Sequence, residues 1–311
     1  MTVFDKIGNT PLFKIDDKEN DIYLKYEGIN SFGSSKDRAA FYVLNKLYED
    51  GKINKETTII ESSSGNMGIA LAMMCKKLGN KFICVIDPHI SPINEYLIRM
   101  MGAEIIKVTE VDNNNSYLKT RLKIVEELLH DRNNSFWFNQ YGNPLVCEAY
   151  KEIGKEIIRD LKDVEYVFVA VSSAGTITGI SKALKDYNSQ IKVIAVDVIG
   201  SKVFDQKTTK KRFLSGIGSS IQSDNLSEAK IDDIILINEK DGIECCYELL
   251  KEHFIFAGGS SGCVYRAIKE YIEKNNLKKA KVVGLLNDRG DRYFKTVYSE
   301  EWVKEKFDME E

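Results

Sequence analysis

The stretch NSFGSSKDR, residues 30–38, places one lysine between a turn of small residues and a helical pattern. The apolar residues of AAFYVL, residues 39–44, recur at helical spacing directly after it. The N-terminus of a helix carries a partial positive charge, which favours anions and disfavours a further cation. Because nothing local favours a lysine at this point, its position predicts a chemical role for Lys36. The alternative is an ordinary solvated lysine in a loop.

The size and composition of the chain are those of a globular protein. It has 311 residues, 43% hydrophobic and 29% charged, which suits one large or two moderate domains. Its 44 basic and 47 acidic residues are spread along the chain, which argues against nucleic acid as a partner. No apolar run approaches the roughly 20 residues that span a bilayer, and residues 1–6 lack the layout of a signal peptide. We therefore expect a cytoplasmic protein with no membrane partner.

The six cysteines are scattered and never form a CxxC pair. Most lie inside apolar patterns, where a free cysteine behaves as a small hydrophobe, and Cys245-Cys246 is expected in the core of a helix. This usage predicts reduced thiols and no metal site. The three histidines, His89, His130 and His253, are expected to be polar residues of helices or loops rather than ligands.

Short apolar strands and helical patterns alternate along the whole chain. The sequence predicts strands at 21–26, 57–61, 82–86, 104–108, 166–171, 190–196, 231–237 and 280–286. It predicts helices at 37–48, 91–101, 116–130, 147–161 and 242–253, and further helices after the turns 62–68, 172–179 and 258–262. This alternation predicts an α/β fold of mostly parallel sheet with helices on both faces. A break near 139–144 predicts two lobes, and 199–230 is expected to be irregular.

Four turns rich in glycine and serine are expected at the carboxyl ends of strands, where open parallel sheets bind ligands. They are 62–68, 172–179, 258–262 and, more loosely, 215–220. Each could be structural alone, since Gly and Ser are common in tight turns. Several in one chain favour anion binding, because a helix start has free N–H groups.

The turn SSAGTITG, residues 172–179, is the best candidate for a phosphate site. It offers hydroxyl groups together with small residues that let the backbone come close. It matches neither GxxxxGK[ST] nor GxGxxG, so a monophosphate fits better than a nucleotide. A monophosphate site together with Lys36 points to pyridoxal phosphate, which needs a lysine, a phosphate site and a partner for its ring nitrogen.

These motifs resemble, in the same order, those of the cysteine synthase and cystathionine β-synthase family, the fold type II pyridoxal-phosphate enzymes. Residues 30–38 resemble the lysine motif, ESSSGNMG (61–68) the asparagine loop, and 172–179 the phosphate loop. Gly216-Ile217-Gly218 and GSSG (259–262) resemble two further turns. The resemblance covers essentially the whole chain.

The resemblance implies a tryptophan synthase β-like fold, with two lobes of twisted, mostly parallel sheet flanked by helices. The larger, cofactor-binding lobe would comprise 1–33 and 144–311. The smaller lobe, 34–143, would be mobile and close over the substrate. The resemblance also implies a homodimer.

The resemblance further implies residue roles. Lys36 would hold the cofactor and move the α-proton, Asn66 would bond the 3′-oxygen of the ring, and Ser260 would donate to the ring nitrogen. A serine leaves that nitrogen essentially neutral, which favours β-elimination over transamination. The expected cofactor-binding residues are Lys36, Asn66, Ser172, Ser173, Ala174, Gly175, Thr176, Gly216 and Ser260. The expected substrate-binding residues are Ser63, Ser64, Gly65, Asn66, Met67, Gln140 and Arg121.

Four further segments resemble the branch of the family that joins O-phosphoserine and glutamate in siderophore pathways, making N-(2-amino-2-carboxyethyl)-L-glutamate. They are PHISP (88–92), NQY (139–141), FAGGS (256–260) and DRGDRY (288–293). Met67 stands where ordinary cysteine synthases carry threonine, and this branch also has an apolar residue there. Arg121 could reach an acidic substituent in this branch; the alternative is a solvated helix arginine. The charges of 288–292 are expected to be a structural cluster near the cofactor face.

The family implies a β-replacement on a β-substituted alanine, through an α-aminoacrylate, with small amino acids as partners. We expect first a cysteine-synthase-like reaction on O-acetylserine, O-phosphoserine or cysteine. The alternatives are N-(2-amino-2-carboxyethyl)-L-glutamate synthase, a cysteine lyase or lanthionine synthase that releases hydrogen sulfide, and a serine or threonine dehydratase. The intact Lys36 argues against a silent binding module, and the missing GxGxxG argues against a Rossmann dehydrogenase.

Overall fold

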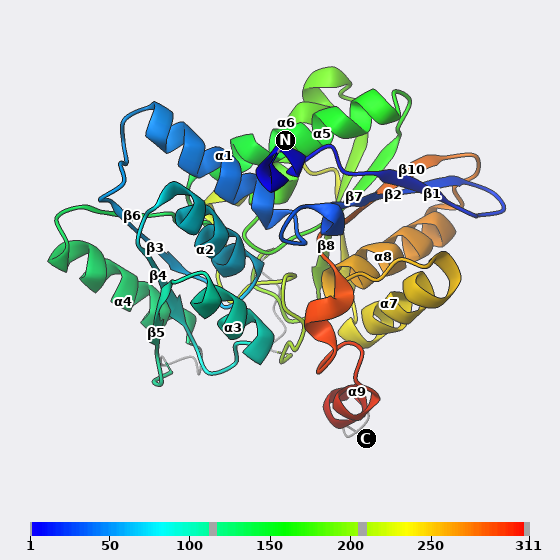
Figure 1. The fold of residues 1–311 in the computed structure, drawn as a ribbon. Helices are drawn as coiled ribbons and strands as arrows, with labels where there is room; N and C mark the ends of the chain where they lie inside the picture. The colour runs from blue at the N-terminus through cyan, green and yellow to red at the C-terminus, as the bar shows by residue number, and fades with distance from the viewer. Residues whose placement is uncertain (1, 112–116, 205–209, 308–311) are drawn as a thin grey trace. The chain divides into compact units, whose positions relative to one another are not determined.

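The computed structural model describes residues 2–111, 117–204 and 210–307 (Figure 1). Its contacts divide the chain into two compact units. Unit 1 comprises Met1–Ser35 and Cys147–Glu311, and unit 2 comprises Lys36–Val146. Ser116, where a helix was predicted to begin, and part of the irregular stretch 199–230 lie outside the described residues.

Unit 1 is built on a six-stranded sheet in the order β1-β2-β10-β7-β8-β9. β1 runs antiparallel to β2, and the other neighbours are parallel. The strands are β1 Leu12–Ile15, β2 Asp21–Tyr26, β7 Tyr166–Ala170, β8 Lys192–Val198, β9 Asp233–Ile237 and β10 Lys281–Leu286. The central strands are nearly continuous apolar runs, which is typical of parallel strands covered on both faces.

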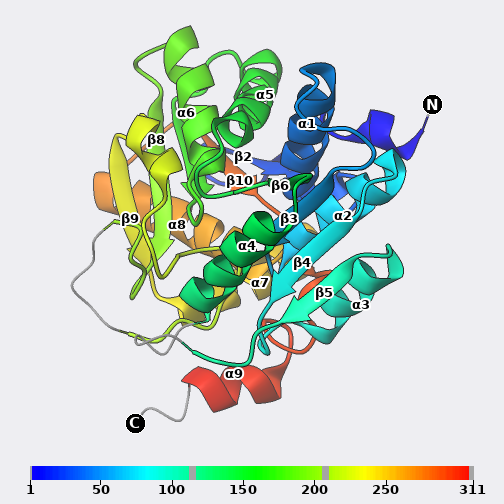
Figure 2. The same cartoon turned by 90° about the vertical axis from the view of Figure 1, so that its left-hand side faces the viewer.

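Helices cover both faces of this sheet. Figures 1 and 2 show α5 and α6 on one face and α7 and α8 on the other. The helices are α5 Pro144–Asp160, α6 Gly175–Tyr187, α7 Glu239–His253, α8 Gly259–Asn275 and α9 Glu300–Phe307. Short 3-10 helices occupy Val3–Lys6, Glu27–Ile29, Asp224–Glu228 and Gly290–Tyr293. α7 and α8 approach closely at Gly262, where a Cβ would lie only 2.1 Å from the carbonyl oxygen of Gly242.

Unit 2 is built on a parallel four-stranded sheet in the order β5-β4-β3-β6. The strands are β3 Thr58–Ser62, β4 Phe82–Ile86, β5 Glu104–Lys107 and β6 Ser135–Trp137. The helices are α1 Lys36–Glu49, α2 Asn66–Leu78, α3 Pro92–Met100 and α4 Leu118–Asp131. α4 covers one face, where Val125 packs with Ile60, Ile83 and Val85, and Figure 2 shows α2 and α3 across the sheet from it.

The predicted α/β architecture is confirmed, with local differences. The predicted strand 82–86 coincides with β4, whereas β1 and β6 were not predicted because each is too short to show a period. α7 begins at Glu239 rather than at 242, because the Asn238 side chain accepts a hydrogen bond from the Lys240 N–H and so caps the helix. α5 begins at Pro144 rather than at 147, since proline is well suited to the first position of a helix.

The prediction that turn 258–262 follows a strand is wrong. The turn follows α7, which Phe254 ends in the left-handed conformation, with φ 57°. Between them a single bridge joins Ala257 to Arg289. Two glycines come directly after this bridge, and glycine weakens a strand. Turn 215–220 likewise lies within the long connection between β8 and β9 rather than at the end of a strand.

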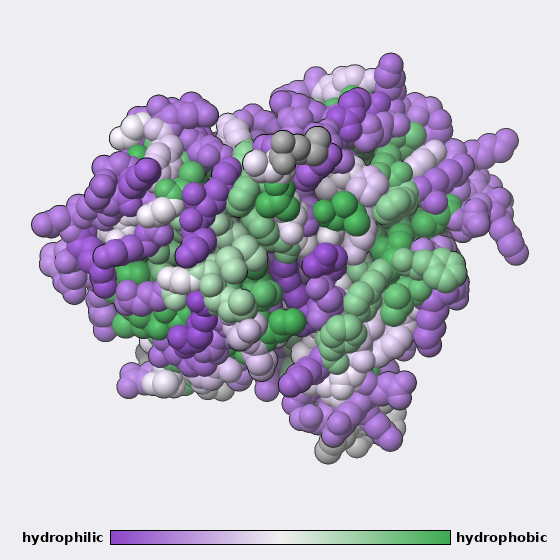
Figure 3. All heavy atoms as spheres, viewed as in Figure 1, coloured by the Kyte–Doolittle hydropathy of each residue, from purple (hydrophilic) through white to green (hydrophobic). Residues whose placement is uncertain are grey.

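The face of the molecule drawn in Figure 3 carries both polar and apolar side chains. All six cysteines are free thiols in the interior, and Cys245 and Cys246 lie in the core between helices as predicted. Within the described ranges, none of the helices has the length and apolar character to cross a membrane.

Candidate active site

The phosphate-loop candidate lies at the start of α6 in unit 1. β7 ends at Ala170, and the chain turns through Ala174, which adopts the left-handed conformation with φ 59°. The turn is closed by a hydrogen bond from the Gly175 N–H to the Ser173 carbonyl oxygen at 2.8 Å. The first N–H groups of a helix lack partners within the helix and carry the positive end of its dipole. Together with the buried Thr176, they form a donor set suited to a phosphate.

Two hydroxyls of this loop already take part in structural hydrogen bonds. Ser172 Oγ donates to the Gly218 carbonyl oxygen at 2.9 Å, and Thr178 Oγ1 donates to the Asn225 carbonyl oxygen at 2.7 Å. Thr178 is 1% exposed, and its hydroxyl joins the start of α6 to the 3-10 helix Asp224–Glu228. Ser172 instead ties the loop to the 216–218 turn, and the Gly218 N–H returns a bond to the Val171 carbonyl oxygen at 2.8 Å.

The 216–218 turn and the 258–262 turn meet within unit 1. A Cβ at Gly216 would lie 3.8 Å from Ser260 Oγ, and Gly216 has φ 84°, a conformation that other residues rarely adopt. Ser260 is the second residue of α8 and is 3% exposed. The structure therefore brings together the two turns from which Gly216 and Ser260 were predicted to bind a cofactor.

The 288–293 segment packs against the 258–262 turn. Tyr293 donates its hydroxyl to Asp288 Oδ2, and Arg292 donates to the Phe32 carbonyl oxygen. Burial and the neighbouring Asp288 carboxylate raise the pKa of the Tyr293 phenol well above its usual value. A Cβ at Gly258 would lie 2.2 Å from Asp288 Oδ1, so Asp288 and the start of α8 are in close contact. The prediction of a structural charge cluster at 288–292 agrees with these contacts.

Lys36 is the first residue of α1 and the first residue of unit 2. The residue before it is anchored in unit 1, where the Ser35 N–H donates to the Asn287 carbonyl oxygen at 2.8 Å and Ser35 Oγ donates to Asn287 Oδ1 at 3.2 Å. Ser34 forms a bridge with Asp288. Lys36 is partly buried, and its neighbours on both sides are buried.

The asparagine-loop candidate connects β3 to α2 in unit 2. Ser63 Oγ accepts hydrogen bonds from the N–H groups of Gly68 at 3.1 Å and Gly65 at 3.4 Å, which fixes the start of the helix. A Cβ at Gly68 would lie 2.7 Å from the Ser63 carbonyl oxygen, so this position requires glycine. Asn66 opens the helix and is partly buried, whereas Met67 is 2% exposed. Because the Met67 side chain belongs to the core, a ligand contact at this position would use its backbone.

Arg121 reaches this loop from α4. Its Nη1 lies 3.1 Å from Ser64 Oγ and 3.1 Å from Asp87 Oδ2, and the side chains of Arg121 and Asp87 are only 14% and 11% exposed. Ser64 Oγ in turn donates to Asp87 Oδ2 at 3.3 Å. The alternative of a solvated helix arginine is therefore wrong. The network places a guanidinium directly against the loop that was expected to bind the substrate.

Gln140 lies beside the same loop, at the end of the neighbouring strand. Its Nε2 donates to the Ser62 carbonyl oxygen at 3.2 Å, and its backbone N–H donates to Glu61 Oε2 at 3.1 Å. Glu61 Oε1 also accepts from the Ser62 N–H at 2.7 Å. Burial raises the pKa of the Glu61 carboxyl to about 7, against the lowering effect of these hydrogen bonds.

Glu61 and Asp87 were missed as site residues. Each comes at the carboxyl end of a strand, Glu61 in β3 and Asp87 directly after β4. Ligand sites of open α/β sheets lie at these ends. An acidic residue at the end of a predicted apolar strand was therefore a signal that could have been used.

The sequence matches the family described as "Pyridoxal-phosphate dependent enzyme" over residues 3–288. The chain belongs to this family. A curated relative from Ralstonia nicotianae, named N-(2-amino-2-carboxyethyl)-L-glutamate synthase, is 39% identical over 308 residues, which cover 97% of this chain and 90% of that protein. A relative of the same name from Cupriavidus metallidurans is 36% identical over 310 residues and covers 97% of this chain and 91% of its own length.

Solved structures confirm the fold. The O-acetylserine dependent cystathionine beta-synthase from Helicobacter pylori matches 96% of this chain and 98% of its own, with a TM-score of 0.87 and 29% identity. The fold type II architecture predicted from the motifs is thus confirmed. The chain is a pyridoxal-phosphate dependent enzyme of the cysteine synthase-like family.

The residues of unit 1 fit the cofactor of this family. The start of α6 supplies N–H donors for a phosphate group, as shown above. Gly216 leaves open the space beside the Ser260 hydroxyl that a side chain would fill. A hydroxyl is a suitable donor to a neutral pyridine nitrogen. The N–H groups of α6 therefore suit the phosphate of pyridoxal phosphate, and the Ser260 hydroxyl suits its ring nitrogen.

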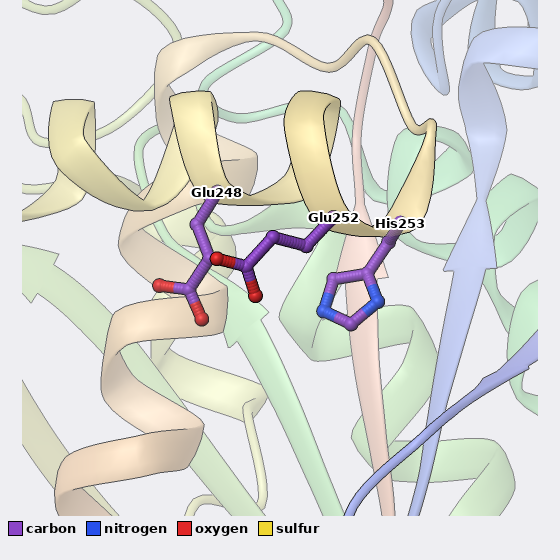
Figure 4. A group of neighbouring side chains, drawn as sticks. All are labelled: Glu248, Glu252 and His253. Carbon is purple, nitrogen blue, oxygen red and sulfur yellow. The ribbon is translucent and has the colours of Figure 1, made fainter.

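A further group of possible ligands lies on α7. Glu248, Glu252 and His253 lie side by side with ligand atoms within 4.8 Å of one another (Figure 4). Lys269 Nζ donates to both oxygens of Glu248, at 2.8 and 2.6 Å. His253 Nε2 lies 3.1 Å from the Tyr265 hydroxyl. These bonds belong to the packing of α7 on α8. The other histidines also have local roles: His89 packs edge-on against Tyr117, and His130 lies in the last turn of α4.

Proposed function

We propose that this enzyme is an N-(2-amino-2-carboxyethyl)-L-glutamate synthase, which carries out a β-replacement on O-phosphoserine with the amine of glutamate. Two curated relatives with this name, matched over at least nine-tenths of their length, support the proposal. The observation that carries it in the structure is the Arg121 guanidinium, held 3.1 Å from Ser64 of the loop. A fixed guanidinium suits a doubly charged phosphate far better than a neutral acetyl group.

The reaction exchanges one bond at the β-carbon for another. The bond from this carbon to the phosphate oxygen breaks, and phosphate leaves with the bonding electrons. A bond from the same carbon to the glutamate nitrogen forms, and that nitrogen loses a proton. The α-proton, removed before the phosphate leaves, returns after the new bond has formed.

We assign the proton transfers and the binding contacts to residues of both units. Lys36 carries the cofactor on Nζ and moves the α-proton. When bound, pyridoxal phosphate withdraws electrons from the α-carbon, which allows the β-substituent to leave. The start of α6, with Ser173 to Thr176, holds the cofactor phosphate, Ser260 donates to the ring nitrogen, and Asn66 bonds the ring oxygen.

In unit 2 the substrate carboxylate is assigned to the start of α2. Ser63, Gly65 and Met67 would contribute through the loop and its N–H groups, because the dipole of a helix N-terminus favours an anion. Gln140 would donate its side-chain amide to the same carboxylate. Ser64 would act with Arg121 on the phosphate substituent, since the two are already hydrogen-bonded.

The proposal is tested by supplying the purified enzyme and pyridoxal phosphate with different donors and acceptors. O-Phosphoserine with glutamate is expected to release inorganic phosphate and to give a product of the mass of N-(2-amino-2-carboxyethyl)-L-glutamate. O-Acetylserine with sulfide and cysteine alone are the competing reactions, of a cysteine synthase and of a lyase that releases hydrogen sulfide. Higher kcat/KM for either of these would overturn the proposal.

The family also supports further proposals. We infer a cytoplasmic homodimer, in which unit 1 binds the cofactor and unit 2 moves on substrate binding. Light scattering on the purified enzyme is expected to give twice the chain mass. A mass equal to one chain would contradict the dimer without affecting the proposed reaction.

A further inference from the structure

We propose that Glu61 is a positioning residue of the substrate loop: its carboxylate joins the ends of β3 and β6 and thereby sets the orientation of Gln140. This inference rests on the proposed role of Gln140 in binding the substrate carboxylate. Glu61 itself is 2% exposed. It acts through its neighbours rather than by touching the substrate.

The backbone pairing of β3 with β6 ends shortly before the residue that the Glu61 carboxylate binds. β3 and β6 are paired up to Ile60 and Trp137, and the Phe138 N–H still donates to the Ile60 carbonyl oxygen at 3.0 Å. After Phe138 the chain turns through Asn139, which has φ 52°. The next N–H, that of Gln140, donates to Glu61 Oε2 at 3.1 Å. The Glu61 side chain thus accepts the hydrogen bond from the chain after β6 that the backbone of β3 no longer accepts.

The same carboxylate also fixes the first residue of the loop. Its other oxygen accepts from the Ser62 N–H at 2.7 Å, and the Ser62 carbonyl oxygen accepts from Gln140 Nε2 at 3.2 Å. Glu61, Ser62 and Gln140 therefore form a closed set of hydrogen bonds. A change at the carboxylate is transmitted to both the backbone and the side-chain amide of Gln140.

The charge of Glu61 is set by the elements that pack around it. Arg121 on α4 favours the ionised form, and Cys84 on β4 has its pKa raised to about 12 by burial, so its thiol stays neutral. Burial raises the pKa of Glu61 to about 7. The ionised carboxylate accepts at both oxygens, whereas the protonated form carries a hydrogen on one of them. The positioning of Gln140 is therefore expected to strengthen as the pH rises through 7.

The test compares the enzyme with its Glu61→Gln variant, which keeps the shape of the side chain but replaces one acceptor with a donor. With O-phosphoserine and with O-acetylserine in turn, Glu61→Gln is expected to raise KM roughly tenfold, the loss of about one hydrogen bond to a charged group. The change in kcat should be smaller, and the pH dependence of KM around pH 7 should flatten. Glu56→Gln, an exposed change of the same charge ahead of β3, is the matched control.

Visible absorbance of the bound cofactor reports whether the variant is folded and loaded. An unchanged KM and pH profile would overturn the proposal, as would a loss of the cofactor band together with all activity. Because either donor serves, failure of the proposed reaction with O-phosphoserine and glutamate would leave this test intact.

Amide hydrogen exchange tests the same contact in the unaltered enzyme. Protection of the Gln140 N–H, relative to its intrinsic rate, is expected to fall roughly tenfold from pH 8 to pH 6. The Phe138 N–H, bonded to Ile60, should keep its protection and serves as the internal control. Equal behaviour of the two amides would contradict the proposal even if Glu61→Gln did not fold.

Discussion

Replacing Arg121 by glutamine removes the guanidinium that the network holds against the loop. The Arg121–Asp87 pair is mostly buried, with exposures of 14% and 11%. Breaking a buried pair costs about 3 to 5 kcal/mol and an exposed one about 0 to 1 kcal/mol. We therefore expect Arg121→Gln to lower the free energy of unfolding by about 2 to 3 kcal/mol. Urea unfolding of the enzyme measures this directly.

Arg121→Gln is expected to lower activity with O-phosphoserine more than activity with O-acetylserine. A hydrogen bond to a charged group contributes about 1.5 to 3 kcal/mol, so kcat/KM with O-phosphoserine should fall roughly ten- to hundredfold. With O-acetylserine, whose substituent is neutral, the change should stay below about threefold.

Lys123→Gln is the matched control, since Lys123 lies on the same helix and pairs with Glu127 at 75% and 53% exposure. It should change the free energy of unfolding by less than about 0.5 kcal/mol. Equal losses for both donors in Arg121→Gln, or no loss for either, would refute the assignment of Arg121 to the phosphate.

Three further predictions follow from the loops and from Glu61. Gly68→Ala places a Cβ 2.7 Å from the Ser63 carbonyl oxygen and should lower the free energy of unfolding by about 1 to 3 kcal/mol; an unchanged urea midpoint would contradict it. Gly216→Ala strains a φ of 84° beside Ser260 and should weaken pyridoxal phosphate binding, measured by fluorescence titration, roughly tenfold; unaltered affinity would count against the turn. The pKa of Glu61 in the folded state is about 7, above the ordinary 4.5. Between these pH values the folded state therefore binds more protons than the unfolded state. The free energy of unfolding should thus fall as the pH rises from 4.5 to 7, by up to about 3 kcal/mol. Glu61→Gln should flatten this dependence.

Much of the fold could be predicted because the signals are local. β4 is a five-residue apolar run whose bounds follow from its side chains alone, and the glycine and serine turns mark the starts of α2, α6 and α8. β1 and β6 could not be predicted, since three or four residues carry no period and the strands form only because a partner strand is present.

The residues of the site also fall into those that the sequence predicted and those that it did not. The turns containing Ser173, Gly216 and Ser260 were predicted from residue type and spacing, and their binding roles stay predictions. The Arg121–Asp87 pair joins residues 34 positions apart in the sequence, through the packing of α4 over β4. No pattern in either segment indicates it. The position of Glu61 at the end of an apolar strand was a usable signal, whereas its hydrogen-bond donors, the N–H groups of Ser62 and Gln140, are known only from the structure.

The most direct test of the account is to locate the amine that carries the cofactor. Reduction of the loaded enzyme with borohydride fixes pyridoxal phosphate on that amine, and peptide mapping then identifies the residue. The account predicts that the label is found on the peptide containing Lys36 and is absent from the Lys36→Ala variant. A label on another lysine, or no label in the unaltered enzyme, would contradict it.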